Sequence, residues 1–272
     1  MSWNQFEFST ADGRPVTLYE FVRGDELFYR YTNADKDIHL NDAVWAAQAI
    51  SDSGLSVGSG DNMDVTVPSD NPVARLFRGV SPSRAVRIRI YRWHVDDTSG
   101  EFRTVWVGTI KEAKREAIDR TRLVTASLAS TFTRVGLRLT YGRACPYALY
   151  DHNCTIDPVR FGVSGLVIDS LDGADIQVMS LPESLENGWF TGGYMEWQTD
   201  GITERRGLKV QDGSVIGVIG GTSGLTAGLA ITLFPGCNRT ISQCAEKFDN
   251  HLNYGGQPHM PGKSPFTIIK LF

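Results

Sequence analysis

The sequence lacks any stretch apolar enough to cross a bilayer as a helix. Its most apolar stretch, residues 214–234, is interrupted by glycine, serine and threonine, so no membrane-spanning segment is expected. The first residues also lack the basic start and apolar core of a signal peptide. We therefore expect the chain to fold in a cytoplasm, where thiols stay reduced, even if an assembly later carries it elsewhere.

The sequence also has little excess of charge. Its 27 lysines and arginines against 31 aspartates and glutamates give a net charge of −4, and no basic block is present. This balance argues against DNA or an anionic membrane as the main partner. The 272 residues, of which 41% are hydrophobic, exclude bulk disorder and suffice for one or two domains with ordinary cores.

Cysteine is scarce, and its arrangement leaves several kinds of site open. Four cysteines are too few for a disulfide scaffold, but four thiolates complete a zinc site or hold an iron–sulfur cluster. Cys145 and Cys154 enclose eight residues, Cys237 and Cys244 enclose six, and 82 residues separate the pairs. The two-residue spacing of zinc ribbons is absent. A metal or cluster site, inert buried cysteines and two disulfides all remain open on spacing alone.

Strand patterns dominate the first half of the chain. Val86, Ile88 and Ile90 alternate with arginines, which predicts a strand over residues 85–95 with one buried and one solvated face. Residues 103–110 are its expected hairpin partner. The other strands expected in this half lie at residues 16–22, 26–31 and 62–68.

The second half is rich in turns. Glycine, at 28 residues in the chain, is above its usual share. Asp-Gly or Asn-Gly pairs that begin at residues 172, 187, 200 and 212 are typical of hairpins, and their frequency indicates a small barrel or sandwich. The strands expected between these turns lie at residues 161–169, 176–181, 189–197, 208–211 and 215–219.

Helical patterns are fewer. Short helices are expected at residues 42–51 and 126–135, while residues 112–118 have a helix-forming composition without apolar periodicity and are left open.

One further helix bears on the cysteines. Thr240 and Gln243 fit a capping box, which predicts a helix that runs to about Phe248. Cys237 then precedes the helix and Cys244 lies about one turn inside it. The positive end of a helix favours thiolates, so this setting adds weight to the second cysteine pair.

Other residues that bear chemistry give little support for an enzyme. Cys145 with His152 suggests a thiol protease pair, but no nucleophile elbow is present, and His152 is rather a candidate ligand or a residue supporting Cys154. His39 and His94 are expected to be surface or packing residues. The glycine-rich run 217–224 lacks the lysine and the helix of a phosphate loop.

The carboxylates and the glycosylation motifs are equally weak signals. Acidic residues at 96–97 and within 169–175 have no aromatic cleft or catalytic partner nearby, so solvated loops are expected there. Asn153 and Asn238 match acceptor motifs for glycosylation, which are incidental without a secretory signal.

The C-terminal stretch carries a more specific pattern. From Phe234 the chain reads Phe-Pro-Gly-Cys-Asn-Arg-Thr-Ile-Ser-Gln-Cys, then Lys-Phe, Asn250, Asn253-Tyr-Gly-Gly, Pro258 and Pro261-Gly. This pattern resembles the C-terminal signature of the phage BR0599-type family, whose members are tail-tip or baseplate hub proteins of long-tailed phages and gene transfer agents.

Agreement upstream is looser but in order. The Leu-Tyr-Asp before Cys154, and the Trp-Phe-Thr-Gly-Gly-Tyr that begins at Trp189, are similar to family elements. The specific resemblance covers residues 141–265, and the N-terminal half matches in style only.

The resemblance implies a trimeric hub of tube-like β domains at the end of the tail tube. Related hubs of gene transfer agents and lambda-type tails carry an iron–sulfur cluster on four cysteines. Carried over, the candidate ligands of a 4Fe–4S cluster, with zinc as the alternative, are Cys145, Cys154, Cys237 and Cys244. The resemblance also implies that the wrap around this group is shaped by Asn250, Asn253, Gly255, Gly256, Pro258 and Pro261.

The expected fold is mainly β (β-rich α+β), with two β-barrel or sandwich modules. The expected parts are an N-terminal β hub module (1–140), a cysteine connector (141–160), a second β module (161–236) and a C-terminal cluster-binding segment (237–272). The expected function is a structural virion protein at the tail tip, not an enzyme, assembled in the host bacterial cytoplasm.

The expected partners are further copies in a homotrimer, a distal tail protein, a central fibre or spike protein and a tail peptidase, with DNA only in transit. A two-domain adhesin with disulfides and a cluster- or zinc-dependent enzyme are the alternatives.

Overall fold

The computed structural model describes residues 3–11, 13–54, 62–95, 97, 99–132, 136, 139 and 141–261. The chain divides into two compact units, Met1–Arg134 and Val135–Phe272. Each unit has its own β-sheet and its own core, so the mainly β class is confirmed. Within the described ranges, no helix combines the length and apolarity needed to cross a membrane.

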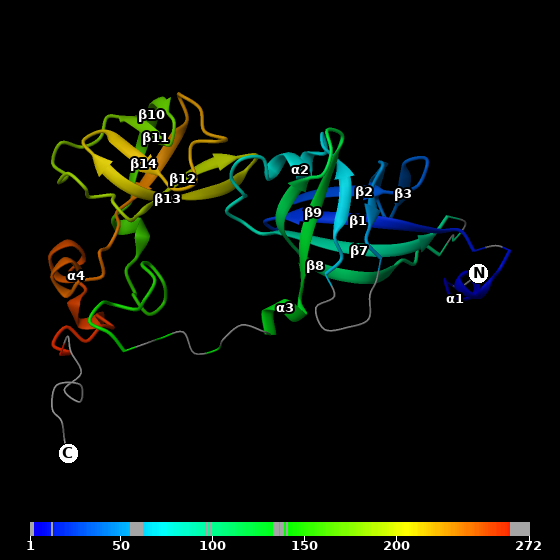
Figure 1. Ribbon diagram of the computed structural model, residues 1–272, viewed down its shortest axis with the longest axis horizontal. Helices are drawn as coiled ribbons and strands as arrows, with labels where there is room; N and C mark the ends of the chain where they lie inside the picture. The colour runs from blue at the N-terminus through cyan, green and yellow to red at the C-terminus, as the bar shows by residue number, and fades with distance from the viewer. Residues whose placement is uncertain are drawn as a thin grey trace, which may run out of the picture. The chain divides into compact units, whose positions relative to one another are not determined.

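The first unit is built on a nine-stranded sheet with the strand order β3-β4-β2-β1-β7-β8-β9-β6-β5 (Figure 1). Neighbouring strands are antiparallel except for β2 and β4, which run parallel. The strands are β1 (Pro15–Arg23), β2 (Leu27–Thr32), β3 (Ile38–Leu40), β4 (Ala43–Ala47), β5 (Ser51–Asp52), β6 (Val65–Pro68), β7 (Val86–His94), β8 (Arg103–Arg115) and β9 (Arg120–Ser127). Its helices are α1 (Trp3–Phe8), α2 (Pro72–Leu76) and α3 (Ala129–Phe132).

The strand predicted at residues 85–95 is confirmed as β7, and its alternation explains how the sheet is covered. Ile88 and Ile90 point into the main core. Tyr91 and Trp93 lie on the opposite face and pack into a smaller cluster with residues of β3 and β4. Because successive side chains of a strand alternate between faces, one strand supplies both cores.

The helix expected at residues 42–51 is wrong, because residues 43–47 form β4. The buried Trp45 meets Tyr91 edge-on, with ring centroids 5.9 Å apart. The alanines in this segment favour a helix. Pairing of β4 with β2 and β3, together with burial of the Trp45 indole, stabilises the strand more strongly.

Two further helical expectations also change. Of the helix expected at residues 126–135 only α3 forms, because residues 126 and 127 complete β9, while residues 133–135 lie outside the described ranges. Residues 112–118, which composition left open, continue β8 to Arg115 and then turn. The Arg115 guanidinium closes that turn by donating to the carbonyl of Ala117 at 3.2 Å.

The second unit contains a closed six-stranded barrel with the order β10-β11-β14-β13-β12-β15, which confirms the barrel expectation. Its strands are β10 (Val163–Asp172), β11 (Asp175–Met179), β12 (Tyr194–Thr199), β13 (Ile202–Asp212), β14 (Val215–Val218) and β15 (Ala230–Phe234). The helices of this unit are η1 (Pro158–Arg160), α4 (Ile241–Phe248) and η2 (His251–Asn253).

Three of the four predicted turn pairs, those at residues 172, 200 and 212, form hairpins. Gly173, Gly201 and Gly213 have positive φ, as hairpin turns of this kind require. The pair at Asn187 is instead a turn before β12, and its side chain donates to Asp212 at 3.0 Å and accepts from the amide of Gly213 at 2.8 Å. Asn187 therefore does not form a hairpin turn itself but hydrogen-bonds to the turn between β13 and β14.

The strand that closes the barrel was not predicted. β15 pairs with β10 on one side and β12 on the other. Residues 189–193, expected to begin a strand, form turns that hold β12 against the end of β15. The barrel closure therefore brings Phe234, and the segment after it, next to the turn before β12.

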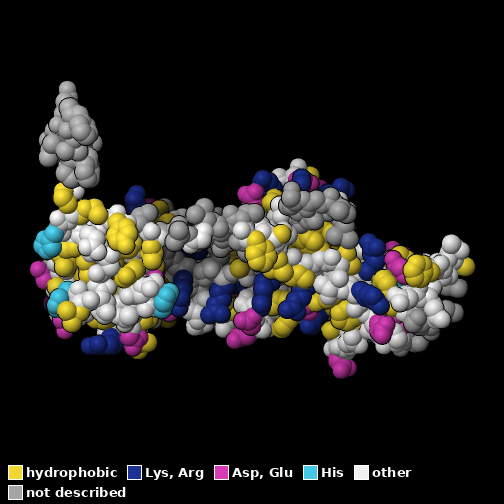
Figure 2. Space-filling model, turned by 90° about the horizontal axis from the view of Figure 1, so that it is seen from below, with side chains coloured by type: hydrophobic (Ala, Val, Ile, Leu, Met, Phe, Trp, Pro, Cys, Tyr) yellow, Lys and Arg dark blue, Asp and Glu magenta, His cyan; other side chains and the backbone are white. Residues whose placement is uncertain are grey.

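Basic and acidic side chains are interspersed over the surface seen in Figure 2. Several are paired across strands of the first unit, including Arg122 with Asp64 at 2.8 Å and Arg30 with Glu20 at 2.9 Å. This distribution agrees with the near-neutral charge of the sequence.

The barrel core can be tested at neighbouring positions of β14. Ile216 is fully buried, whereas Val215 is 41% exposed. Ile216→Ala is expected to lower the free energy of unfolding of the second unit by about 2–5 kcal/mol, because it removes buried methyl groups and leaves a cavity. Val215→Ala is the matched control and should cost far less. Urea denaturation measures both, and equal losses would contradict the assigned register.

Candidate functional site

All four cysteines line one cavity of about 210 Å³ in the second unit. Cys145 and Cys154 come from the connector, Cys237 from the loop after β15 and Cys244 from α4. Cys244 is buried and the other three are half-buried. All four are free thiols, so the disulfide alternative does not occur in this structure.

The cavity is larger than a single ion needs. A zinc ion bound by thiolates sits about 2.3 Å from each sulfur, whereas this cavity has room for several water molecules. In the part of the chain that the structure describes, no three His, Cys, Asp or Glu side chains are arranged to hold a metal ion. The four thiols therefore line one space together, and in the described residues they are not gathered around a single ion position.

The electrostatics also show how close the thiols lie. Burial, followed by the charges of the other three cysteines, raises the pKa of Cys244 to about 11. Burial likewise raises the pKa of Cys237, with Cys154 and Cys145 adding to the effect. The negative charge of one thiolate disfavours ionisation of its neighbours. A positive group in the cavity would therefore be needed to keep several of these thiols ionised together.

The connector reaches the cavity through a turn organised by Asp151. Its carboxylate accepts hydrogen bonds from the backbone amides of Cys154 at 2.7 Å and Asn153 at 3.0 Å. These bonds, with that from Cys154 foremost, lower the pKa of Asp151. The turn therefore fixes the backbone at Cys154.

Two asparagines of the C-terminal signature tie this turn to the end of the chain. Asn250 donates to the carbonyl of Cys154 at 2.5 Å, and Asn253 donates to the hydroxyl of Thr155 at 3.0 Å. Because the partners lie nearly a hundred residues apart, these bonds join the two cysteine-bearing segments directly.

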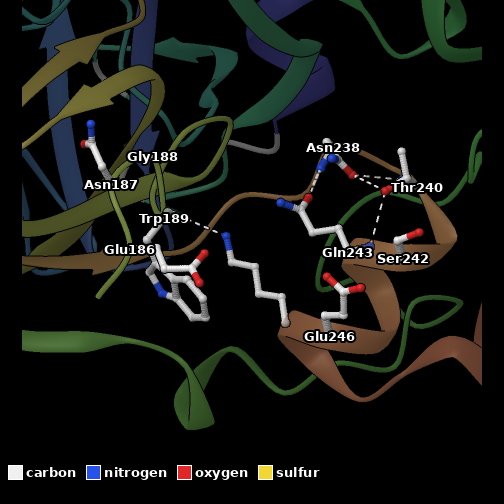
Figure 3. A pocket seen from close by; sticks show the side chains of 10 residues that line it. Glu186, Asn187, Gly188, Trp189, Asn238, Thr240, Ser242, Gln243 and Glu246 are labelled. Carbon is white, nitrogen blue, oxygen red and sulfur yellow. Dashed lines mark hydrogen bonds between the residues drawn. The ribbon is translucent and has the colours of Figure 1, made fainter. Parts of the chain in front are cut away.

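The N-terminus of α4 forms largely as predicted. The Thr240 hydroxyl caps the helix by accepting from the amide of Gln243 at 3.3 Å (Figure 3). The Gln243 side chain, however, accepts from the amide of Asn238 instead of Thr240. Cys237 lies before the helix, and the amide of Arg239 donates to its sulfur at 3.3 Å. The carbonyl of Arg239 accepts from the amide of Cys145 at 3.0 Å, so the two cysteine pairs share a backbone hydrogen bond.

The glycines of the signature allow segments to pass in contact. A Cβ at Gly236 would lie 1.9 Å from the carbonyl oxygen of Thr191, and a Cβ at Gly255 would lie 2.4 Å from the ring of Tyr147. Tyr254, beside Gly255, donates to the carbonyls of Arg143 at 2.6 Å and Arg239 at 2.9 Å. Side chains at these glycines would push the cysteine segments apart.

Backbone strain is concentrated around the same cavity. Of the eight non-glycine residues with positive φ in the described ranges, four flank the cysteines, namely Tyr150, Thr155, Arg239 and Asp249. Such conformations cost of order 1–3 kcal/mol each and persist where the surroundings hold them. Thr155 is held by the bond from Asn253, and Arg239 by the bond from the amide of Cys145 to its carbonyl.

The other candidate residues are not brought to the cavity. His152 is exposed and does not line it, so a supporting role for His152 is not found. His39 is exposed on β3, and His94 is a buried packing residue that pairs with Glu7 at 3.0 Å. The run 217–224 forms β14 and the turns after it, with no helix following. Asp96 lies outside the described residues, as does Gly262 of the signature.

Two residues near the cavity had no role assigned from the sequence. Tyr150 donates to the carbonyl of Pro235 at 2.7 Å and packs edge-on against Tyr194, and its burial raises its pKa. Lys247 donates to backbone carbonyls on two segments. Both belong to the family-like pattern, but only the fold shows what they contact.

Two family models match the chain. The model described as baseplate hub protein, N-terminal attachment domain, matches residues 12–157, and the model described as phage conserved hypothetical protein BR0599 matches residues 188–264. A solved chain from the virion of a native gene transfer agent particle has a similar fold, with a TM-score of 0.80 and 19% identity over 96% of this chain and 93% of that one. No curated protein matches the sequence.

The close passage at Gly236 can be tested with a second glycine as control. Gly236→Ala places a methyl group against backbone atoms, which cannot turn aside, so we expect a loss of about 1–3 kcal/mol in unfolding free energy. Gly142→Ala has no atom within 4 Å of the new Cβ and is expected to be near neutral. Thermal unfolding of both variants is the measurement, and a neutral Gly236→Ala would contradict the described crossing.

Proposed function

We propose a role for this chain on the basis of its family. The chain belongs to the phage baseplate hub protein family, whose N-terminal attachment domain model matches residues 12–157. It is a structural protein of a phage tail. In this role it is a hub at the tail tip that joins the distal tail ring to a central fibre or spike protein. That family match carries the proposal, and the likeness in fold to a chain of a gene transfer agent virion supports it.

The proposed partners are protein surfaces. Further copies in a homotrimer, a distal tail protein and a central fibre or spike protein are the neighbours, and a tail peptidase is a further one. The sheet of the first unit supports such contacts. Among the described residues its end strands β3 and β5 each pair with a strand on one side, and sheet edges of this kind can pair with another chain. The near-neutral charge suits a lumen that DNA crosses without adhering.

We further propose that the four cysteines hold an iron–sulfur cluster, with zinc as the alternative. The support is the donor set: four free thiols around one cavity of about 210 Å³. When bound, the group supplies a cross-link whose binding energy becomes folding energy for a loop-rich region. Asp151 and Asn250 hold the backbone at Cys154 for this purpose, and Tyr254 holds the connector at Arg143. The role is structural, not enzymatic.

The cluster is tested by purifying the protein without oxygen and recording its visible spectrum with iron and sulfide analysis. We expect a brown protein with iron and sulfide in equal amounts. Zinc at one ion per chain would overturn the cluster and support the zinc alternative. Colourless protein with four free thiols and no metal would overturn both.

The ligand assignment is tested by Cys237→Ser, with Ser242→Ala as the control from the start of α4. Cys237 lines the cavity, whereas Ser242 does not. The cysteine variant is expected to lose most of its bound metal and to unfold at a lower temperature, because the loop after β15 loses its anchor. Unchanged metal content in Cys237→Ser would remove Cys237 from the ligand set.

The location is tested by labelling intact particles with antibodies against this chain. Electron microscopy is expected to show label at the end of the tail farthest from the head. Label on the head, or none on intact and tip-opened particles, contradicts a tail-tip hub.

A further inference from the structure

The Lys247 side chain connects three parts of the second unit. Its ammonium donates to the carbonyl of Trp189 at 2.5 Å and to the carbonyl of Gly236 at 2.9 Å. Lys247 itself is on α4, three residues after Cys244, and Gly236 immediately precedes Cys237. One amine therefore fastens the helix that carries one cysteine to the loop that carries another, and holds both against the turn before β12.

The surroundings of this amine are unusual for a lysine. It lies 4.4 Å from the centroid of the Trp189 ring, within cation–π range. Burial lowers the pKa of Lys247 to about 8, and the negative charges of Cys237 and Glu186 oppose that shift. The amine is therefore mainly protonated at neutral pH, and it adds a positive charge beside the thiol of Cys237.

A polar cleft of about 320 Å³ borders this contact. Figure 3 shows Glu186 and Trp189 on one side of it and Gln243 and Glu246 of α4 on the other. Lys247 lines the same cleft and also reaches the loop of Cys237. It therefore links this cleft to the loop of Cys237, a residue that lines the cysteine cavity.

We propose that Lys247 is the positioning residue of the cysteine site: it fixes the loop of Cys237 and provides the positive charge that balances the bound group. The charge part of this proposal rests on the proposed function. Four thiolates bring more negative charge than a zinc ion or a cluster core returns, so a half-buried cation near Cys237 stabilises the loaded site. The positioning part does not require any bound group, because both carbonyl contacts are within the protein.

The experiment compares Lys247→Met, which keeps the length of the side chain without its charge, with Lys247→Arg, which keeps the charge. Lys209→Met is the control, since Lys209 is an exposed lysine of β13 in the same unit. All variants are made in the full chain and studied as purified.

The first measurement is amide hydrogen exchange over residues 236–239. Lys247→Met is expected to raise exchange there about tenfold or more, because the loop loses its donor, while Lys209→Met leaves it unchanged. Unchanged exchange in Lys247→Met overturns the positioning role. This result is independent of any metal, so it stands or falls separately from the proposed cluster.

The second measurement is the reduction potential of the cluster-bearing protein. Loss of the cation disfavours the added electron, so Lys247→Met is expected to lower the ratio of reduced to oxidised cluster about tenfold, about 59 mV for a one-electron couple. Lys247→Arg is expected to stay near the parent value even where loop protection is incomplete. A potential unchanged in Lys247→Met overturns the charge role.

If the protein holds zinc instead, the charge role is read from the rate of zinc transfer to a chelator. Lys247→Met is then expected to release zinc about tenfold faster than Lys209→Met, because the thiolates lose a compensating charge. Equal rates overturn the charge role for the zinc form.

Discussion

The contact between the connector and the C-terminal segment is the constraint on which the cysteine site depends. These segments lie nearly a hundred residues apart in sequence, and neither has a regular sheet to hold it. Side-chain donors bind backbone carbonyls across the gap, as Asn250 does at Cys154 and Tyr254 does at Arg143. Bonds of this kind satisfy backbone groups that a strand or helix would otherwise satisfy.

The barrel makes that contact possible. Its closure by β15 delivers the chain at Phe234 next to the turn before β12, and the glycine at position 236 lets the two backbones pass in contact. The loop of Cys237 therefore begins at the end of β15, a strand that is paired on both sides. A strained residue, Arg239, follows two positions after Cys237, and another, Asp249, ends α4. The cost of their conformations is met by the interactions around them.

Part of the site could be predicted from the sequence. The cap of α4 at Thr240 follows from a local motif, whereas the spacing of the cysteines left several kinds of site open, and the part played by the C-terminal glycines came only from the family resemblance. The strand at 85–95 and the Asp-Gly hairpins were likewise predicted, because alternation and turn chemistry are local properties. The helix expected at 42–51 was wrong because Trp45 is buried by residues distant in sequence, and β15 was not predicted because closure of a barrel is not a property of one strand.

The sequence by itself determined that this is a mainly β protein of balanced charge with four cysteines in two local pairs. Only the tertiary structure decided that the four thiols share one cavity, that His152 stays outside it, and that Lys247 reaches the carbonyl before Cys237. The physical reason is distance along the chain. Turns, caps and alternation arise between neighbours, whereas a cavity shared by residues 145 and 244 exists only after the barrel has closed and brought their segments together.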